Sequence, residues 1–439
     1  MKAINLQSRS LENIWTIFLT AAIPFIGVLG ASLIPYTLRL PLMTVTFVFA
    51  IITFMFSDIR IRLNIPNITF FLLITYIAVS IFFTIDKEST LTLLFFYICC
   101  FPMLFLKLPD ATLKRIISIC YIVSTVIAIS IVISVPISNC MDRYFWFIVN
   151  PTRSPITSQA LARELSLGAY SGFAREMGEA AFIVNVGISI SLSKFFTNHK
   201  LTKTQFSVLA LQIVALLLTG KRTYLFAGLI CFLLFFIFSR INGKFFKFCV
   251  IILLGTTVIL LLMMFIPQTA TAINKLLDSE NMGRLGGRSF LWKHIYSMID
   301  EYWLFGAGFG SYNQYAFSHG LLVNNAMWKY NAHNCYLQIL GELGIIGLSL
   351  FITFIISSLF ISAKALRTAN NNGDKAQIGA MYFSLFNQLL MTIYSFTSNP
   401  IYTKQILFIG LFTTGIALNI RNRQNPANTK LTRRSSYEI

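Results

Sequence analysis

The chain has 439 residues, of which 56% are hydrophobic and 12% are charged, about half the charged fraction of an ordinary soluble protein. The mean hydropathy is +0.71 over the whole length. This value excludes a soluble enzyme held by one membrane anchor, because a single spanning helix of about 20 residues would raise the average hydropathy of the chain only slightly. The net charge is +19, and the seven cysteines show neither zinc-site spacing nor a disulfide framework. We therefore predict an all-α integral membrane protein that binds no nucleic acid.

Apolar runs long enough to cross the bilayer recur along the chain and predict about 12 transmembrane helices. The first run is too long for a cleavable signal peptide and lacks a small-x-small exit, so we expect it to be retained. The predicted spans lie near residues 13–34, 41–57, 67–85, 90–106, 116–137, 179–193, 205–219, 223–239, 248–267, 335–362, 378–398 and 405–420.

The basic residues orient these spans. With a cytoplasmic N-terminus, most of the 35 Lys and Arg residues fall on the inner side, as the positive-inside rule requires, and both termini are cytoplasmic. The expected organisation is spans 1–5 in 1–137, an outer loop at 138–178, spans 6–9 in 179–267, a second outer loop at 268–334, spans 10–12 in 335–420 and a basic tail at 421–439.

The two outer loops are too long to be simple turns, and loops of this length are usually functional. Disordered spacers are the alternative, but both loops are rich in aromatic residues and contain little low-complexity sequence. In the second loop, apolar residues recur at helical spacing from Ser289 to Leu304, which predicts a helix lying on the bilayer surface.

Basic residues are frequent in these loops, where membrane orientation does not require them. Cations on this side point to an anionic ligand such as a phosphate. Binding to lipid headgroups is the alternative for any one of them. The residues concerned are Arg143, Arg153, Arg163, Arg175, Lys275, Arg284, Arg288, Lys293 and Lys329.

A second basic feature, Lys221-Arg222, interrupts an otherwise apolar stretch from Val208 to Phe238. Cations so placed face a high desolvation cost unless they reach water or an anion. They form either an anion site or a tight turn whose side chains extend to the membrane surface.

The sharpest pattern surrounds the second outer loop. It consists of G-R-S-F-L-W from Gly287, L-F-G-A-G-F-G from Leu304 and H-N-C-Y-L-Q-I-L-G-E-L-G from His333. His333 stands where the loop re-enters the membrane, and a neutral imidazole there can accept a hydroxyl proton. The alternative is a histidine that only satisfies hydrogen bonds. His199 is predicted to be cytoplasmic, and His294 and His319 to lie within the loop, so they compete weakly.

These strings resemble the shared core of the O-antigen ligase and O-antigen polymerase superfamily over about 285–348, with support from Thr219-Gly220-Lys221-Arg222-Thr223. The resemblance implies a GT-C-type membrane glycosyltransferase that uses undecaprenyl-pyrophosphate-linked glycans at the periplasmic face of the bacterial inner membrane. It also implies His333 as the base and Arg222 and Arg288 as diphosphate ligands. We expect the diphosphate site to include Lys221, Arg284 and Arg175, and its supporting residues to be Gly287, Asn334 and Glu342.

The chemistry agrees with these implied roles. Departure of a pyrophosphate-lipid leaves negative charge on a phosphate oxygen, which guanidinium groups can stabilise without a metal. No D-x-D motif occurs in the outer loops, so we expect neither a metal site nor a cofactor. Glu342 either orients a partner or satisfies polar groups inside the bundle.

Motifs shared by the superfamily do not separate polymerase from ligase. We favour the polymerase because Ser171-Gly172-Phe173-Ala174-Arg175-Glu176 looks like the start of a spanning helix in polysaccharide polymerases. A polymerase would work with a chain-length regulator, whereas a ligase would use lipid A-core as acceptor. A lipid-linked glycan flippase is a third reading, but it should carry charges within several spans, and nearly all of these spans are uncharged.

Overall fold

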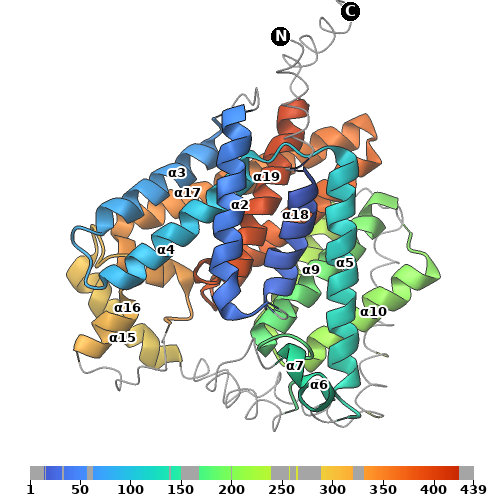
Figure 1. Cartoon of the computed structure of the whole chain (residues 1–439), viewed down its shortest axis with the longest axis horizontal. Helices are drawn as coiled ribbons and strands as arrows, with labels where there is room; N and C mark the ends of the chain where they lie inside the picture. The colour runs from blue at the N-terminus through green and yellow to red at the C-terminus, as the bar shows by residue number, and fades with distance from the viewer. Residues whose placement is uncertain are drawn as a thin grey trace, which may run out of the picture. The chain divides into compact units, whose positions relative to one another are not determined.

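The computed structural model describes residues 16–31, 34–56, 63–137, 140–149, 168–198, 200–238, 288–319 and 331–424, together with residues 14, 257 and 264. All regular structure in these ranges is helical, as predicted (Figure 1). Most of the predicted span at 248–267, with Arg284 and Gly287, lies outside the described residues.

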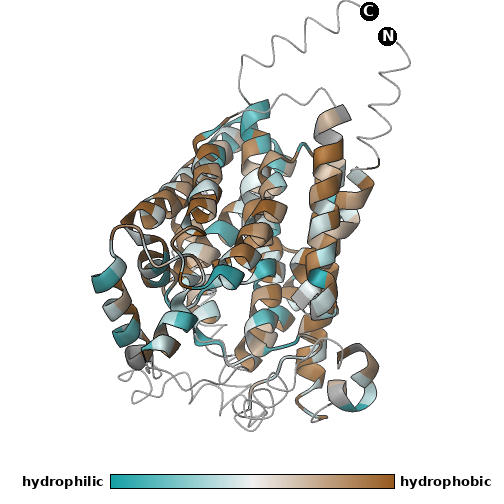
Figure 2. Ribbon diagram, turned by 60° about the vertical axis from the view of Figure 1, so that its left-hand side comes forward, coloured by the Kyte–Doolittle hydropathy of each residue, from teal (hydrophilic) through white to brown (hydrophobic). Residues whose placement is uncertain are grey.

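A helix occupies every predicted span within the described ranges, and the long helices are largely hydrophobic (Figure 2). Four helices are long and apolar enough to cross a membrane, namely Lys87–Phe105, Asp110–Ile133, Met177–Asn198 and Cys335–Asn372. The full count of 12 spans stays a prediction. The helices at predicted spans are Thr16–Val28, which ends in the π-helical turn η1 (Pro24–Val28), α2 (Tyr36–Phe56), α3 (Ile65–Ser80), α4 (Lys87–Cys100) with η3 (Phe101–Phe105), α5 (Asp110–Ile133), α9 (Met177–Asn198), α10 (Lys203–Leu218), α11 (Arg222–Phe238), α17 (Cys335–Asn372), α18 (Lys375–Tyr394) and α19 (Lys404–Arg423).

Shorter helices occur within the two predicted outer loops. They are α6 (Cys140–Tyr144), α7 (Trp146–Val149), α15 (Arg288–Tyr302) and α16 (Tyr312–Ser318). Helix α15 confirms the helix predicted at Ser289 to Leu304, since Ile295 and Met298 of the predicted apolar stripe are buried. Its position on the bilayer surface stays a prediction.

The chain divides into two compact units. The first comprises Met1–Gly27, Arg39–Ile116 and Arg284–Ile439, and its core forms where α3, α18 and α19 pack against α17 (Figure 1). The ring of Phe70 on α3 lies 5.6 Å from that of Tyr97 on α4 and 5.0 Å from that of Phe354 on α17. Aromatic packing thus joins three helices around one buried side chain.

The second unit comprises Val28–Leu38 and Ile117–Gly283, and α9 is packed there against α10 and α11. The buried face of α9 carries small and polar residues, which allow close approach and hydrogen bonding between apolar helices. The hydroxyl of Ser191 donates to Gln212 of α10 at 3.1 Å, and a Cβ added at Gly187 would contact Ser124 of α5.

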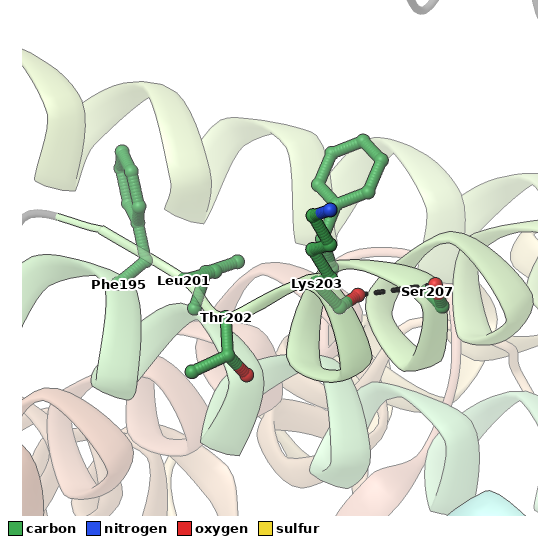
Figure 3. Close-up of a pocket in the computed structure, with 6 residues that line it drawn as sticks. Phe195, Leu201, Thr202, Lys203 and Ser207 are labelled. Carbon is green, nitrogen blue, oxygen red and sulfur yellow. Dashed lines mark hydrogen bonds between the residues drawn. The ribbon is translucent and has the colours of Figure 1, made fainter.

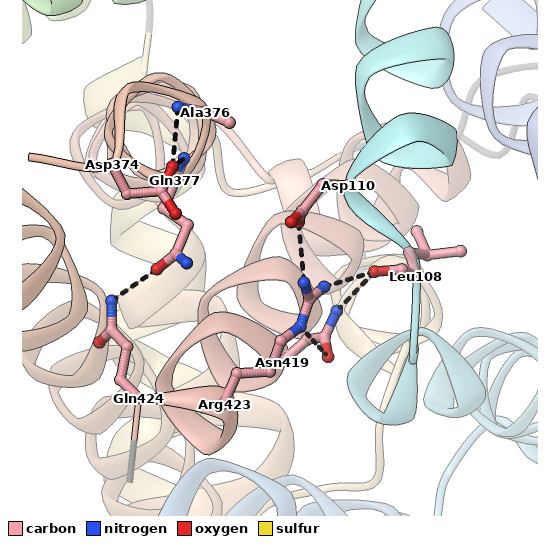
Figure 4. Close-up of polar contacts among 8 residues, drawn as sticks. All are labelled: Leu108, Asp110, Asp374, Ala376, Gln377, Asn419, Arg423 and Gln424. Atoms are coloured by element: carbon pink, nitrogen blue, oxygen red, sulfur yellow. Dashed lines mark hydrogen bonds and ion pairs between the residues drawn. The ribbon is translucent and has the colours of Figure 1, made fainter. Parts of the chain in front are cut away.

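The C-terminal helix of the first unit ends in a polar cluster (Figure 4). Arg423 pairs with Asp110 at 2.8 Å and donates to the carbonyl of Leu108, while Gln424 donates to Gln377 at 2.9 Å. Arg421 and Arg423, predicted to begin a basic tail, therefore belong to α19.

Candidate functional site

His333 directly precedes the N-cap of α17 and adopts a left-handed backbone conformation with φ of 52°. It is the one non-glycine residue with positive φ among those the structure describes. This conformation costs an L-residue about 1–2 kcal/mol, so the fold must impose it. Residues held in this way gather at functional sites, and the side chain of His333 is exposed.

The residues on both sides of His333 are fixed by hydrogen bonds. The amide of Ala332 donates to Gln338 Oε1 at 3.0 Å, and the carbonyl of Ala332 accepts from Trp292 Nε1 of α15 at 2.9 Å. On the other side, Asn334 caps α17 by accepting from the amides of Tyr336 and Leu337 at 3.1 and 3.2 Å. The histidine backbone is thereby clamped between α15 and α17.

The other described histidines are placed differently. His294 on α15 is buried, and this burial, together with the charge of Lys293, lowers the pKa of its imidazole. His319 follows α16, and its Nδ1 lies 2.9 Å from the carbonyl of Tyr315. His199 lies outside the described residues. Exposure separates His333 from the buried His294 but not from His319, which is also exposed, so it is the left-handed backbone that distinguishes His333 among the described histidines.

Glu342 lies two turns into α17 and is fully buried. Its Oε1 accepts from Gln338 Nε2 at 2.9 Å and from the amide of Tyr312 at 3.1 Å. Its Oε2 accepts from the hydroxyl of Tyr402 at 2.6 Å and from the amide of Gly310 at 2.7 Å. Four donors thus offset the high cost of burying a carboxylate. These contacts are compatible with both roles expected for Glu342, since it satisfies polar groups inside the bundle and also holds Gln338.

The glycine-rich segment from Leu304 docks where α17 is broken. Gly344 has φ of 63° and ψ of −168°, which interrupts the helix. The amides of Ala307 and Gly308 donate to the carbonyls of Gly341 and Glu342 at 3.1 and 2.8 Å. The second and third sequence strings therefore form one hydrogen-bonded assembly in the first unit.

Lys221 and Arg222 lie in the second unit, at the corner between α10 and α11. The corner turns at Gly220, which has φ of 64°, and Arg222 is the first residue of α11. The amide of Tyr170 donates to the carbonyl of Leu218 at 2.9 Å, so the chain at Tyr170 lies against this corner. Both cations are half-buried at the N-terminus of a helix, where backbone amides favour anions.

Part of the chain is similar to a known protein family. Residues 207–352 match the family model of O-antigen ligase. The resemblance to the O-antigen ligase and polymerase superfamily is therefore confirmed for this part of the chain. The match supports a membrane enzyme of the ligase and polymerase type in general. No curated protein sequence matches the chain.

Residues 207–352, which match the family model, include most of the predicted site residues. His333, Asn334 and Glu342 are connected within the first unit, and the backbone of Arg288 begins α15 there. Lys221 and Arg222 form the corner in the second unit, while Arg284 and Gly287 lie outside the described residues. Arg175 precedes the O-antigen ligase match.

Arg175 already has partners in the structure. Its guanidinium donates to Glu179 at 2.7 Å and lies 3.6 Å from Glu176. The Glu179 carboxylate is buried, so this ion pair stabilises the start of α9. A diphosphate that bound Arg175 would have to compete with this carboxylate.

Sequence reasoning missed Gln338, Asn399 and Tyr402. Gln338 joins the backbone before His333 to Glu342, and Asn399 donates to Gln338 Oε1. Gln338 and Glu342 are four residues apart in an apolar helix, and this spacing was the signal available in the sequence. Tyr402 offered no local signal because it is 60 residues from its partner.

Two other features bear on the site. In the described ranges, no group of three or more His, Cys, Asp or Glu side chains is arranged to hold a metal ion. A hollow lined by Phe195, Leu201, Thr202, Lys203, Phe206 and Ser207 lies where α9 meets α10 (Figure 3). It is at the N-terminal end of α10, about 24 Å along the helix from the corner that carries Lys221 and Arg222.

Proposed function

We propose that the chain polymerises undecaprenyl-pyrophosphate-linked O-antigen repeat units at the periplasmic face of the bacterial inner membrane. The proposal rests on one observation above all: the exposed His333 is held in a left-handed conformation within the region that matches the O-antigen ligase family. A backbone held by hydrogen bonds on both sides of His333 fixes the point from which its imidazole reaches a substrate, which suits a base that must act repeatedly in one geometry.

In the proposed reaction, the imidazole of His333 accepts the proton of an acceptor hydroxyl as its oxygen attacks the anomeric carbon of the donor sugar. The bond between that carbon and the phosphate oxygen breaks, and the electron pair leaves with undecaprenyl pyrophosphate. Arg222 and Arg288 stabilise the departing diphosphate through paired N–H donors. Lys221, Arg284 and Arg175 add positive charge, and the transfer needs no metal.

The ligase is the second candidate function, favoured by the description of the matching family. It would use the same donor and leaving group, but the acceptor would be lipid A-core. The polymerase is favoured instead by the likeness of Ser171-Gly172-Phe173-Ala174-Arg175-Glu176 to the start of a spanning helix in polysaccharide polymerases.

A deletion strain distinguishes the two functions. Without a polymerase, lipopolysaccharide should carry a single repeat unit, and complementation should restore long chains. Lipopolysaccharide core that carries no repeat at all would identify the chain as the ligase instead.

A further inference from the structure

Helices α6 and α7 present two different faces. Cys140, Met141 and Val149 are buried, and the ring of Phe145 lies 5.3 Å from that of Phe173 at 80°. In contrast, Tyr144, Trp146 and Phe147 are 56%, 61% and 60% exposed. The pair of helices is thus fixed to the second unit on one side and displays three aromatic side chains on the other.

The helix that leads to this face has an apolar exposed side. On α5, exposed residues recur every three or four positions, which places them in one stripe along a helix apolar enough to span a membrane. The stripe continues in the chain with Ile137, which is also exposed and lies three residues before α6. Its members on α5 are Ile122, Val126, Ile129 and Ile133.

The chemistry of the exposed face fits the boundary between hydrocarbon and headgroups. Trp and Tyr are enriched there because their rings combine apolar and polar parts. The guanidinium of Arg143 lies 5.6 Å from the centre of the Tyr144 ring, where it is available to lipid phosphates. An aqueous surface would leave three large aromatic side chains exposed together, which soluble surfaces seldom do.

We propose that α6 and α7 form an interfacial anchor whose partner is the lipid bilayer, with Tyr144, Trp146 and Phe147 inserted at the headgroup level. The anchor continues the apolar stripe of α5 into the membrane interface.

The anchor is connected to the basic corner of the second unit. The amide of Phe173 donates to Ser130 of α5 at 3.1 Å, and Tyr170, in the same segment, is bonded to Leu218 beside the corner. Because Tyr170 and Phe173 are three residues apart, the anchor and the Lys221 corner are held close together within the second unit.

Fluorescence quenching by spin-labelled lipids tests the anchor without any turnover assay, and so independently of the proposed function. The protein is reconstituted in phosphatidylcholine and phosphatidylglycerol vesicles whose lipids carry a nitroxide either near the glycerol backbone or near the end of the acyl chain. The signal of Trp146 is the difference between wild type and Trp146→Phe. The double variant Trp146→Phe/Phe145→Trp is the matched control, because it moves the tryptophan by one residue to the face packed on Phe173.

We expect the shallow nitroxide to quench the Trp146 signal more strongly than the deep one, and aqueous iodide to quench it weakly. The tryptophan introduced by Phe145→Trp should lose much less signal to either lipid. Strong iodide quenching of Trp146 without lipid quenching would overturn the proposal in favour of an aqueous surface. Protection from both quenchers would overturn it in favour of cover by protein, either another part of this chain or a second copy.

Discussion

The backbone conformation at position 333 is one that favours glycine, but the residue there is a histidine. The left-handed φ of 52° comes at an energetic cost for this exposed histidine. Selection for stability alone would not place a histidine at this position. A histidine can be retained at this strained position if its imidazole takes part in a reaction, and strained residues are typical of functional sites.

This strain predicts a reversed order of stability for two substitutions. Glycine is normally less stable than alanine within regular structure, but His333→Gly should be more stable than His333→Ala by about 1 kcal/mol, since only glycine tolerates positive φ. Thermal unfolding of both variants in detergent measures the difference. The same pair at the exposed helical residue Lys364 should show the usual order, and the usual order at both positions would contradict the strain.

The cations are predicted to act through geometry as well as charge. Arg222→Lys and Arg288→Lys keep the charge but lose the paired planar donors, so each should lose much of the transferase activity. Arg367→Lys, on the exposed side of α17, should have little effect. Glycan chain distributions at equal expression provide the measurement, and near-normal distributions from both site variants would reduce these arginines to membrane-surface charges.

The local pattern singles out His333, Arg222 and Glu342 as candidates but not the contacts around His333 and Glu342. Gln338 holds the residue before His333, and Asn399 reaches Gln338 from 61 residues further along the chain. Such contacts depend on how α17 and the segment before α19 pack, and no local periodicity encodes that packing.

Among the elements, the helices were predictable because each spanning segment must be continuously apolar. The break in α17 was not, because the residues around Gly344 maintain the apolar pattern without interruption. The break becomes intelligible only with the docked segment, since the amide of Ile345 donates to the carbonyl of Trp303 at 2.9 Å. The apolar run predicted as a span near 335–362 is part of a longer helix that continues to Asn372 and carries Lys364 and Arg367 as exposed residues.

The break requires glycine for two reasons, which a pair of substitutions separates. Gly344→Ala adds a Cβ against the Leu304 backbone at a positive φ, whereas Gly373→Ala has positive φ but nothing within 4 Å. We expect Gly373→Ala to cost about 1 kcal/mol and Gly344→Ala about 3 kcal/mol or more. Unfolding measured for both in detergent provides the comparison, and equal costs would show that the docked segment yields freely.

For the whole molecule, hydropathy and charge predict how the chain crosses the membrane. An impermeant thiol reagent added to intact cells should label Lys293→Cys in the second outer loop but not Lys200→Cys between α9 and α10. Background should be low because the six native cysteines within the described ranges are buried. Labelling of Lys200→Cys with protection of Lys293→Cys would invert the topology and place the proposed site in the cytoplasm.

We propose His333 as the base of a metal-independent glycosyl transfer. The decisive measurement is turnover of a lipid-linked repeat by purified His333→Ala in EDTA, beside donor binding on the same preparation, with His319→Ala as control. We expect wild type and His319→Ala to turn over in EDTA, and His333→Ala to lose about 10²- to 10⁴-fold while it still binds the donor through its arginines. Turnover of His333→Ala at the wild-type rate would remove His333 from the mechanism. Joint loss of turnover and binding, or wild-type turnover that depends on added Mg²⁺, would also contradict the account.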